Sequence, residues 1–346
     1  MSPDLSNHRH RPAGALLLLA AALIAITVPA AAPAGAAPTV PAAAPAGASP
    51  TVPAHRTHLL TAGLRGALGS TVGPDGALYV VEGAAGRISR VDARTGRTTT
   101  FASGLPRRIL DTGGAMDVAF VHHRPYVLVT LVGPDVGGSD IDGIYRVDGP
   151  NRVTVVADIG AWSLAHPPVP EFFVPTGVQY ALEPHRGGFL VTDGHHNRLL
   201  RVEVDGDITE LAAFPNVVPT GITTGDRSVY LAQAGPVPHA PSDGKVLRVE
   251  PRSRRASEVA SGAPLLVDVE FGRDHRLYAL SQGHFTPGNP EGSPADPATG
   301  TLVRVNRDGT MTPVAGGLDR PTSLEFIRDT AYVVTLTGEI WTIDCR

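Results

Sequence analysis

The segment VTDGHHNRLLRV groups more potentially reactive side chains than any other short stretch of the chain. Asp193, His195, His196 and Asn197 follow one another almost without interruption. A carboxylate beside imidazoles is typical of metal sites and of general acid–base catalysis. Adjacent side chains of an extended segment point to opposite faces, so one ion would seldom bind both histidines. The alternative is a turn between two strands that happens to carry histidines.

Other catalytic chemistry has little support in the sequence. No G-x-S-x-G motif is present, so a serine nucleophile of the hydrolase type is not indicated. The single cysteine, Cys345, is the penultimate residue and has no candidate catalytic partner nearby in the sequence. A single cysteine cannot form an intramolecular disulfide, so we expect the stability of the fold to come from the burial of apolar side chains.

The N-terminal part of the 346-residue chain has the composition of an export signal. Polar residues with two arginines precede an uncharged apolar run, and small residues follow with A-x-A cleavage options. We predict a signal peptide at residues 1–36, a Pro/Ala-rich linker at 37–55 and secretion of the remainder, with an uncleaved signal anchor as the alternative. The net charge of −4 predicts no nucleic-acid partner, and we expect no membrane contact after cleavage.

A repeated phrase organises the rest of the chain. It consists of glycine or asparagine, apolar residues, then Arg-Val and an acid or asparagine, as in GRISRVD, GIYRVD, NRLLRVE, GKVLRVE and GTLVRVN, with GEIWTID as a degenerate sixth copy. Two alternating apolar strands precede each copy, and a further strand follows the first five. Four strands repeated around an axis predict an all-β, six-bladed β-propeller over residues 56–346. A β-sandwich with chance similarity is the alternative.

The last repeat lacks its fourth strand, and the missing strand is found at the other end of the domain. Residues 57–64, THLLTAGL, match the fourth-strand phrase and precede the first blade. We therefore expect an N-terminal strand to pair into the last blade and close the ring. This closure would remove an open sheet edge.

The phrases PTGVQY, GGFLVTDGHHNRLLRVEVDG, QAGPVPHAPSDGKVLRV and GGLDRPTSLEF resemble the NHL-like six-bladed propellers, and among them the ScyD/ScyE family of secreted bacterial proteins. The resemblance covers about residues 57–346 and implies the fold, but it supplies no catalytic residues. Similar repeats carry an aspartate and an asparagine around the turn after the second strand. The resemblance thus implies that Asp193 and Asn197 fix a turn, with the two histidines at its variable tip.

Alignment of the repeats places polar residues in two rings near the axis. The first ring is Gly69, Asp117, Gly177, Gly221, Asp268 and Ser323, and the second is Glu82, Thr130, Asp193, Gln233, Ser281 and Thr335. The longest loops of the repeats lie on the same face, which we take as the ligand-binding face. The candidate residues of that face are Glu82, Asp117, His166, Glu171, Asp193, Gln233, Asp268 and His284.

Four of these residues, Asp117, Asp268, Glu82 and Asp193, are candidate metal ligands. Carboxylates around a water-filled axis suit Ca²⁺ or Mg²⁺. The alternative is that each carboxylate caps backbone amides of a neighbouring loop.

The sequence leaves open whether the protein is an enzyme. The first interpretation is a secreted, monomeric propeller that binds a small molecule or an extracellular protein at the long-loop face. The second is a metal-dependent hydrolase or lyase, lactonase-like or streptogramin-lyase-like, that uses the axial carboxylates. In a lyase of that type His166 or His284 with Glu171 would be the matching pair. A purely structural scaffold is the third interpretation, because propellers serve all three roles.

Overall fold

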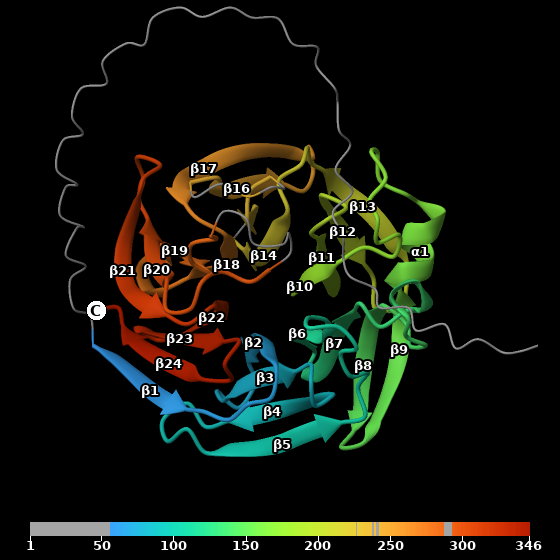
Figure 1. The fold of residues 1–346 in the computed structure, drawn as a ribbon, viewed down its shortest axis with the longest axis horizontal. Coiled ribbons are helices and arrows are strands. Elements are labelled where there is room, and N and C mark those ends of the chain that lie inside the picture. The colour runs from blue at the N-terminus through green and yellow to red at the C-terminus, as the bar shows by residue number, and fades with distance from the viewer. Residues whose placement is uncertain (1–55, 226, 237–238, 240–241, 287–292) are drawn as a thin grey trace, which may run out of the picture. The chain divides into compact units, whose positions relative to one another are not determined.

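The computed structural model describes residues 56–225, 227–236, 239, 242–286 and 293–346. These residues form six four-stranded antiparallel sheets arranged around a central axis, a six-bladed β-propeller (Figure 1). The predicted signal peptide and linker, residues 1–36 and 37–55, lie outside the described residues. Within the described part, no helix has the length and apolar character needed to cross a membrane.

Each blade runs from an inner strand near the axis to an outer strand at the rim, in sequence order. The strands of blades 1 to 3 are β2 (Ala67–Val72), β3 (Leu78–Glu82), β4 (Arg87–Val91), β5 (Thr98–Ser103); β6 (Gly114–Val121), β7 (Arg124–Thr130), β8 (Gly143–Gly149), β9 (Arg152–Asp158); and β10 (Gln179–His185), β11 (Gly188–Asp193), β12 (Arg198–Val202), β13 (Ile208–Ala213). Those of blades 4 to 6 are β14 (Pro219–Thr224), β15 (Val229–Gln233), β16 (Gly244–Glu250), β17 (Arg255–Ala263); β18 (Leu266–Phe271), β19 (Leu277–Ser281), β20 (Gly300–Val305), β21 (Met311–Leu318); and β22 (Pro321–Ile327), β23 (Thr330–Thr335), β24 (Ile340–Asp344).

Blade 6 takes its outer strand from the start of the described chain. β1 (Thr57–Thr61) pairs antiparallel with β24, with Thr57 opposite Ile343 and Leu59 opposite Trp341. Both ends of the described chain therefore meet at the rim of one blade (Figure 1). This pairing covers the edge that β24 would otherwise expose.

The second strands of the blades are buried because neighbouring blades pack on both of their faces. Every residue of β3 and of β19 is buried, whereas outer strands such as β5 and β13 have one buried residue each and are otherwise exposed or half-buried. A strand covered on both faces reads as a continuous apolar run. The core therefore lies between the blades and not within them.

The first strand of every blade carries a register shift. Shifts fall between Ala67 and Ser70, Ala115 and Asp117, Gln179 and Leu182, Pro219 and Ile222, Leu266 and Asp268, and Pro321 and Ser323. Such bulges bend a strand and change which face a side chain points to. They therefore determine which residues of the first strands face the axis.

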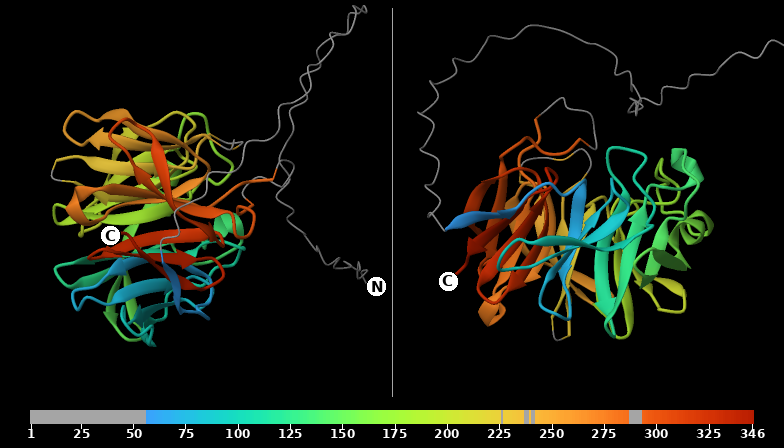
Figure 2. Two further views of the ribbon diagram at one scale, coloured as in Figure 1. Left: turned by 90° about the vertical axis from the view of Figure 1, so that its left-hand side faces the viewer. Right: turned by 90° about the horizontal axis from the view of Figure 1, so that it is seen from below.

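The two faces of the ring differ in their connections (Figure 2). The long-loop face carries the second-to-third-strand loops and the links between blades, including α1 (Ile159–Ala165) and the 3-10 turn η1 (Pro134–Val136). The opposite face, here named the hairpin face, carries the hairpins between first and second and between third and fourth strands, with the 3-10 turn η2 (Arg273–His275). Asp158 caps α1 by accepting a hydrogen bond from the Ala161 N–H at 2.8 Å.

Candidate functional site

Five members of the second predicted ring occupy equivalent positions, each opposite the residue two before the first ring, as Glu82 is opposite Ala67. In blade 2 this position is Val129, opposite Ala115, and Thr130 lies one residue beyond it. All six predicted residues are at most 1 % exposed. Glu82 accepts hydrogen bonds from the Arg65 N–H at 2.7 Å, Arg87 Nε at 2.8 Å and Ser89 Oγ at 2.5 Å. Its oxygens are thus engaged within and beside blade 1.

Asp193 belongs to a buried polar network under α1. It accepts hydrogen bonds from the Val178 N–H at 3.1 Å and from Arg198 Nε at 3.0 Å. Arg198, only 2 % exposed, also donates to Ser163 Oγ at 2.9 Å and to the His166 carbonyl at 2.8 Å. The guanidinium therefore ties α1 to blade 3, and a fully paired buried charge of this kind is a structural element.

The two histidines of the opening segment have different surroundings. His196 is buried, with Nε2 3.0 Å from the Val174 carbonyl and Nδ1 2.8 Å from Arg198 Nη2. Nδ1 also lies 3.0 Å from Asp193 Oδ2, and Nε2 donates to the Val174 carbonyl, which can only accept. His196 is therefore held within the network and does not have a free nitrogen for a ligand.

His195 lies above the network, half-buried against an aromatic ring. Its ring stacks on Phe172 with a centroid distance of 4.6 Å and an interplanar angle of 15°. Burial, with a smaller contribution from nearby His239, lowers the pKa of His195 to about 4. Asn197, at φ +53°, accepts hydrogen bonds from the N–H groups of Val217 and Val218, each at 2.8 Å. The turn-fixing role predicted for Asp193 and Asn197 agrees with these contacts.

The other predicted loop residues do not gather around one point. The His166 ring stacks on Trp162 at 4.3 Å, with Nδ1 2.9 Å from the Trp162 carbonyl, while Glu171 is exposed five residues later. His284 is exposed in the β19–β20 loop of blade 5, where its N–H donates to Thr299 Oγ1 at 3.0 Å. Gln233, 1 % exposed, has no partner for Nε2 among the described residues.

Asp117 and Asp268 bridge backbone amides of adjacent strands. Asp117 accepts from the Val118 N–H at 2.8 Å and from the Leu182 N–H of blade 3 at 2.7 Å. Asp268 accepts from the Val269 N–H at 2.8 Å and from the Leu324 N–H of blade 6 at 2.7 Å. The two carboxylates thus join blade 2 to blade 3 and blade 5 to blade 6.

One member of the first predicted ring is wrong. The register of β10, with Leu182 opposite Val191, makes Ala181 and not Gly177 the equivalent of Asp117 and Asp268. Gly177 instead lies before β10, at φ +85°, where a Cβ would meet the Asp193 carboxylate at 2.6 Å. The bulge in β10 inserts extra residues into this strand, so an alignment of the repeats without gaps assigns the ring position to the wrong residue.

A third set of acids, which sequence reasoning missed, lines the axis. Glu183, Glu270 and Glu325 occupy the same position of blades 3, 5 and 6, two residues after the first ring. With Asp117 and Asp268 they surround an axial cavity of about 50 Å³. The sequence contained a signal for these acids. Side chains of a strand alternate between its two faces, so the residue two positions after Asp268 or Ser323 also faces the axis.

Burial raises the pKa values of all five axial carboxyl groups. Desolvation raises the pKa of Glu183 and that of Asp268 to about 7. For Asp117, Glu270 and Glu325 desolvation and the neighbouring carboxyl groups hold the pKa well above its ordinary value. The axis therefore favours protonated carboxyl groups near neutral pH.

The structure does not assemble the expected cation site. Glu82 and Asp193 are engaged inside blades 1 and 3, whereas Asp117 and Asp268 line the axial cavity. No group of three or more His, Cys, Asp or Glu residues in the described ranges could hold a metal ion. The four carboxylates instead accept hydrogen bonds from backbone amides, arginine side chains and a serine hydroxyl.

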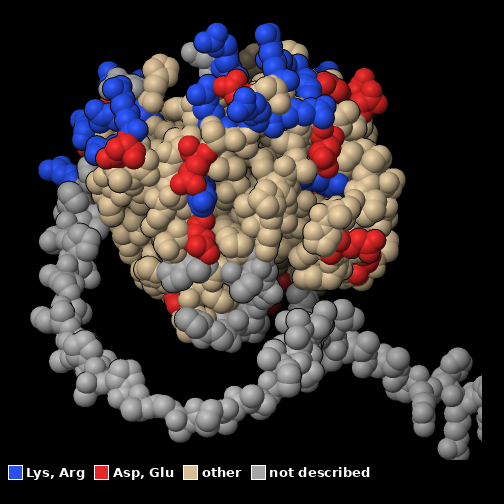
Figure 3. Space-filling view, turned by 90° about the horizontal axis from the view of Figure 1, so that it is seen from above, with Lys and Arg blue, Asp and Glu red and all other residues tan. Residues whose placement is uncertain are grey.

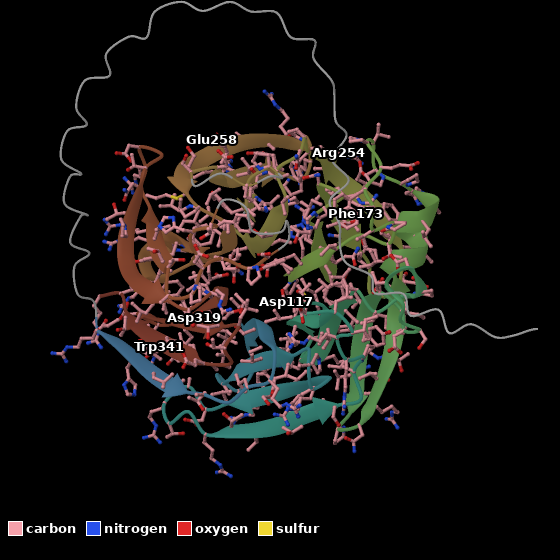
Figure 4. All side chains as sticks on the ribbon, in the orientation of Figure 1. Asp117, Phe173, Arg254, Glu258, Asp319 and Trp341 are labelled. Carbon is pink, nitrogen blue, oxygen red and sulfur yellow. The ribbon has the colours of Figure 1, made fainter. Side chains whose placement is uncertain are left out.

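The long-loop face carries an exposed apolar surface beside these networks. Seven large apolar side chains of the described residues are exposed. Five of them lie in the loops and the helix α1 of this face around blades 1 to 3: Ile109, Ile141, Leu164, Val169 and Phe173. Val169 is 99 % exposed and Phe173 is 70 % exposed. We name these five residues the apolar loop surface. Phe173 lies toward α1, away from Asp117 near the centre (Figure 4).

Contacts between the loops join the apolar loop surface into one sector. Thr176 Oγ1 donates to Asp135 Oδ2 at 2.8 Å, which links the chain before β10 to the β7–β8 loop. The Gly160 N–H of α1 donates to the Asp142 carbonyl at 2.9 Å. Exposed acids accompany the apolar residues in these same loops, namely Asp111, Asp135, Asp140 and Glu171.

Comparison with known proteins supports the architecture alone. No family model and no curated protein matches the chain. Among solved structures, a gluconolactonase from Xanthomonas campestris is similar at 11 % identity and a TM-score of 0.59, over 84 % of this chain and 89 % of that one. A PQQ-bound aldose sugar dehydrogenase from Streptomyces coelicolor is similar at 14 % identity and a TM-score of 0.57, over 85 % and 99 %.

A virginiamycin B lyase from Staphylococcus aureus is also similar, at 16 % identity and a TM-score of 0.50, over 84 % of this chain and 98 % of that one. These neighbours are β-propeller proteins, and lactonase-like and lyase-like members are among them. At such low identity the similarity extends to the fold and not to the chemistry. The ScyD/ScyE resemblance has no counterpart among these comparisons.

Proposed function

We propose that the protein is a binding propeller whose apolar loop surface docks a partner protein outside the cell. The observation that carries the proposal is the concentration of exposed large apolar side chains in one sector of the long-loop face. Exposed apolar side chains gathered in one place are typical of interaction sites, whereas single scattered ones need no explanation. We also propose that the protein is exported, is monomeric and is of the ScyD/ScyE type.

The shape of the surface supports a polypeptide as the occupant. Small-molecule sites are concave and have volumes of roughly 300–1,000 Å³. The axial cavity, at about 50 Å³, is far smaller, and its lining is rich in carboxyl groups. The exposed Phe173 suits the aromatic anchor of a protein interface.

Charge supports a partner with basic residues around an apolar centre. Asp111, Asp135, Asp140 and Glu171 are exposed in the loops that carry the apolar residues, and Arg107 is an exposed cation in the same region. Complementary charges at an interface rim steer association and orient the partner. The surface therefore fits a segment in which leucine-like residues are flanked by lysine or arginine.

A labelled peptide of alternating leucine and lysine tests the proposal by fluorescence anisotropy. We expect Val169→Ser with Phe173→Ser to weaken binding about tenfold, because anchor residues carry most of an interface's energy. Val204→Ser is the matched control, since Val204 is 41 % exposed in the β12–β13 hairpin of the opposite face. Equal affinity for the double variant and the control would overturn the proposal.

The second candidate is a metal-dependent hydrolase or lyase that uses the axial carboxylates with Ca²⁺ or Mg²⁺. The fold similarity to a gluconolactonase favours it. Against it, no group of three or more His, Cys, Asp or Glu residues among the described residues is placed to hold an ion. Thermal unfolding with Ca²⁺, with Mg²⁺ and with chelator separates the candidates. Equal melting temperatures are expected of the binding propeller, whereas a rise of several degrees with either ion would favour the enzyme.

A further inference from the structure

Arginine side chains gather on the hairpin face, away from the apolar loop surface. Figure 3 shows Lys and Arg along one side of the molecule, the side turned away from the viewer of Figure 1. The sequence contains a single lysine, Lys245, so this side is basic through arginine. The net charge of −4 averages over this asymmetry and conceals it.

Many of the arginines are structural, and the repeated phrase explains them. In Arg-Val-acid the arginine and the acid lie two residues apart on one face of the third strand. Arg146 Nε is 2.7 Å from Asp148, and Arg201 Nε is 2.6 Å from Glu203. These residues neutralise each other and contribute little net charge to the surface.

The hairpins of blade 4 and their neighbours carry a second class of arginines. These are exposed, and no ion pair joins them to an acid of the described residues: Arg186, Arg227, Arg252, Arg254, Arg255 and Arg276. We name them the arginine patch. Arg248 links β16 to the β14–β15 hairpin, because its Nε donates to Ser228 Oγ at 2.8 Å.

Arg254 occupies a backbone position that favours glycine. Its N–H donates to the Glu250 carbonyl at 2.8 Å, and its φ is +56°. Blade 1 makes the same turn with Gly96, whose N–H donates to the Asp92 carbonyl at 2.9 Å and whose φ is +71°. An arginine in this conformation costs free energy that glycine would not. Its exposed side chain makes no ion pair in the described structure to offset that cost.

We propose that the arginine patch binds an anionic polysaccharide. Guanidinium groups bind sulfate and carboxylate groups through paired N–H donors, and several of them spaced along hairpins match charges repeated along a chain. The hairpins of blades 3 to 5 present no exposed Phe, Tyr or Trp in the described ranges, so nucleic-acid bases have no stacking partner. Val204 is their only exposed large apolar side chain within the same ranges, so a lipid surface has no anchor.

Heparin, as a sulfated polysaccharide probe, tests the proposal against uncharged dextran of similar length. We expect the wild type to bind heparin and not dextran, with an affinity that falls steeply with salt. Arg252→Gln with Arg254→Gln should weaken heparin binding about tenfold and flatten the salt dependence. The control, Arg65→Gln with Arg107→Gln, removes the same charge from exposed residues of the long-loop face and should change the affinity less than about twofold.

Other outcomes would overturn the proposal. An equal loss in both double variants would mean that the net charge, and not the arginine patch, governs binding. Tighter binding to duplex DNA or to vesicles with anionic lipid than to heparin would exclude a polysaccharide as the occupant. Salt-sensitive self-association by gel filtration, lost in the patch variant, would assign the patch to a second copy of this chain.

A second patch variant guards against a folding defect. Arg254→Gly removes the charge and relieves the left-handed backbone, so we expect it to fold at least as well as the wild type. Heparin affinity should nevertheless fall severalfold. Unchanged heparin affinity in this variant would show that Arg254 does not contribute to the binding site.

Discussion

The carboxylate of Asp117 in blade 2 accepts a hydrogen bond from the backbone N–H of Leu182 in blade 3, at 2.7 Å. Asp268 makes the same bond to Leu324, from blade 5 to blade 6. Glycines stand beside both acids, since a Cβ on Gly69 or Gly221 would collide with the Asp117 or Asp268 carboxylate. The arrangement repeats after three blades, so the acids hold the inner strands together at two opposite places.

Loss of Asp117 should therefore destabilise the ring. Asp117→Ala leaves the N–H groups of Val118 and Leu182 without acceptors, and we expect the free energy of unfolding to fall by about 2–4 kcal/mol. Asp117→Asn keeps one acceptor and should lose less. Urea unfolding measures both, with exposed Asp111→Ala as the control, expected within about 0.5 kcal/mol of wild type. Equal midpoints for Asp117→Ala and the control would contradict the bridging role.

The axial acids predict a stability that falls as the pH rises. The pKa values of Glu183 and Asp268 are about 7 in the folded protein, above their ordinary values, because burial disfavours the charged form. Their contribution is complete below the pKa of the unfolded chain and is lost as the pH rises through about 7.

Melting temperatures between pH 5 and pH 8 test this dependence. Glu183→Gln should flatten the decline, since Thr224 Oγ1 can still donate to the retained carbonyl oxygen and no charge develops. Glu171→Gln, at an exposed position, should leave the profile unchanged. A wild-type melting temperature that rises steadily over this range would be incompatible with the raised pKa values.

Arg198 should be among the most sensitive positions of the chain. Arg198→Met would leave the Asp193 carboxylate buried without its charged partner and release α1 from blade 3. We expect a loss of about 3–5 kcal/mol in the free energy of unfolding. Arg201→Met is the comparison, because Arg201 pairs with a partly exposed Glu203 and such pairs are worth at most about 1 kcal/mol. Similar unfolding midpoints for both variants would refute the assignment.

Arg254→Gly should stabilise the protein. Glycine accepts the φ of +56° without the steric cost of a side chain, and we expect a gain of about 1 kcal/mol. Chemical denaturation gives the difference, and Arg252→Gly in the same hairpin controls for loss of charge. A gain of equal size in both variants would show that charge repulsion, and not the backbone, is the source.

The sequence alone determined the architecture, because each blade repeats the same local pattern. Alternating apolar residues, turn glycines and the Arg-Val-acid phrase identified six blades and five of the six members of the second ring. They also identified the N-terminal strand predicted at residues 57–64, of which Thr57–Thr61 pair with β24. These features depend on neighbours within a few residues, so periodicity reveals them.

Only the tertiary structure decided which acids meet and which are engaged elsewhere. Bulges in the first strands moved the ring position from Gly177 to Ala181 and brought Glu183, Glu270 and Glu325 to the axis. The network that joins Asp193 to α1, and the arginine patch of three blades, depend on contacts between segments far apart in the chain. A repeat pattern determines each blade separately, whereas a site on a propeller is built from the distances between blades.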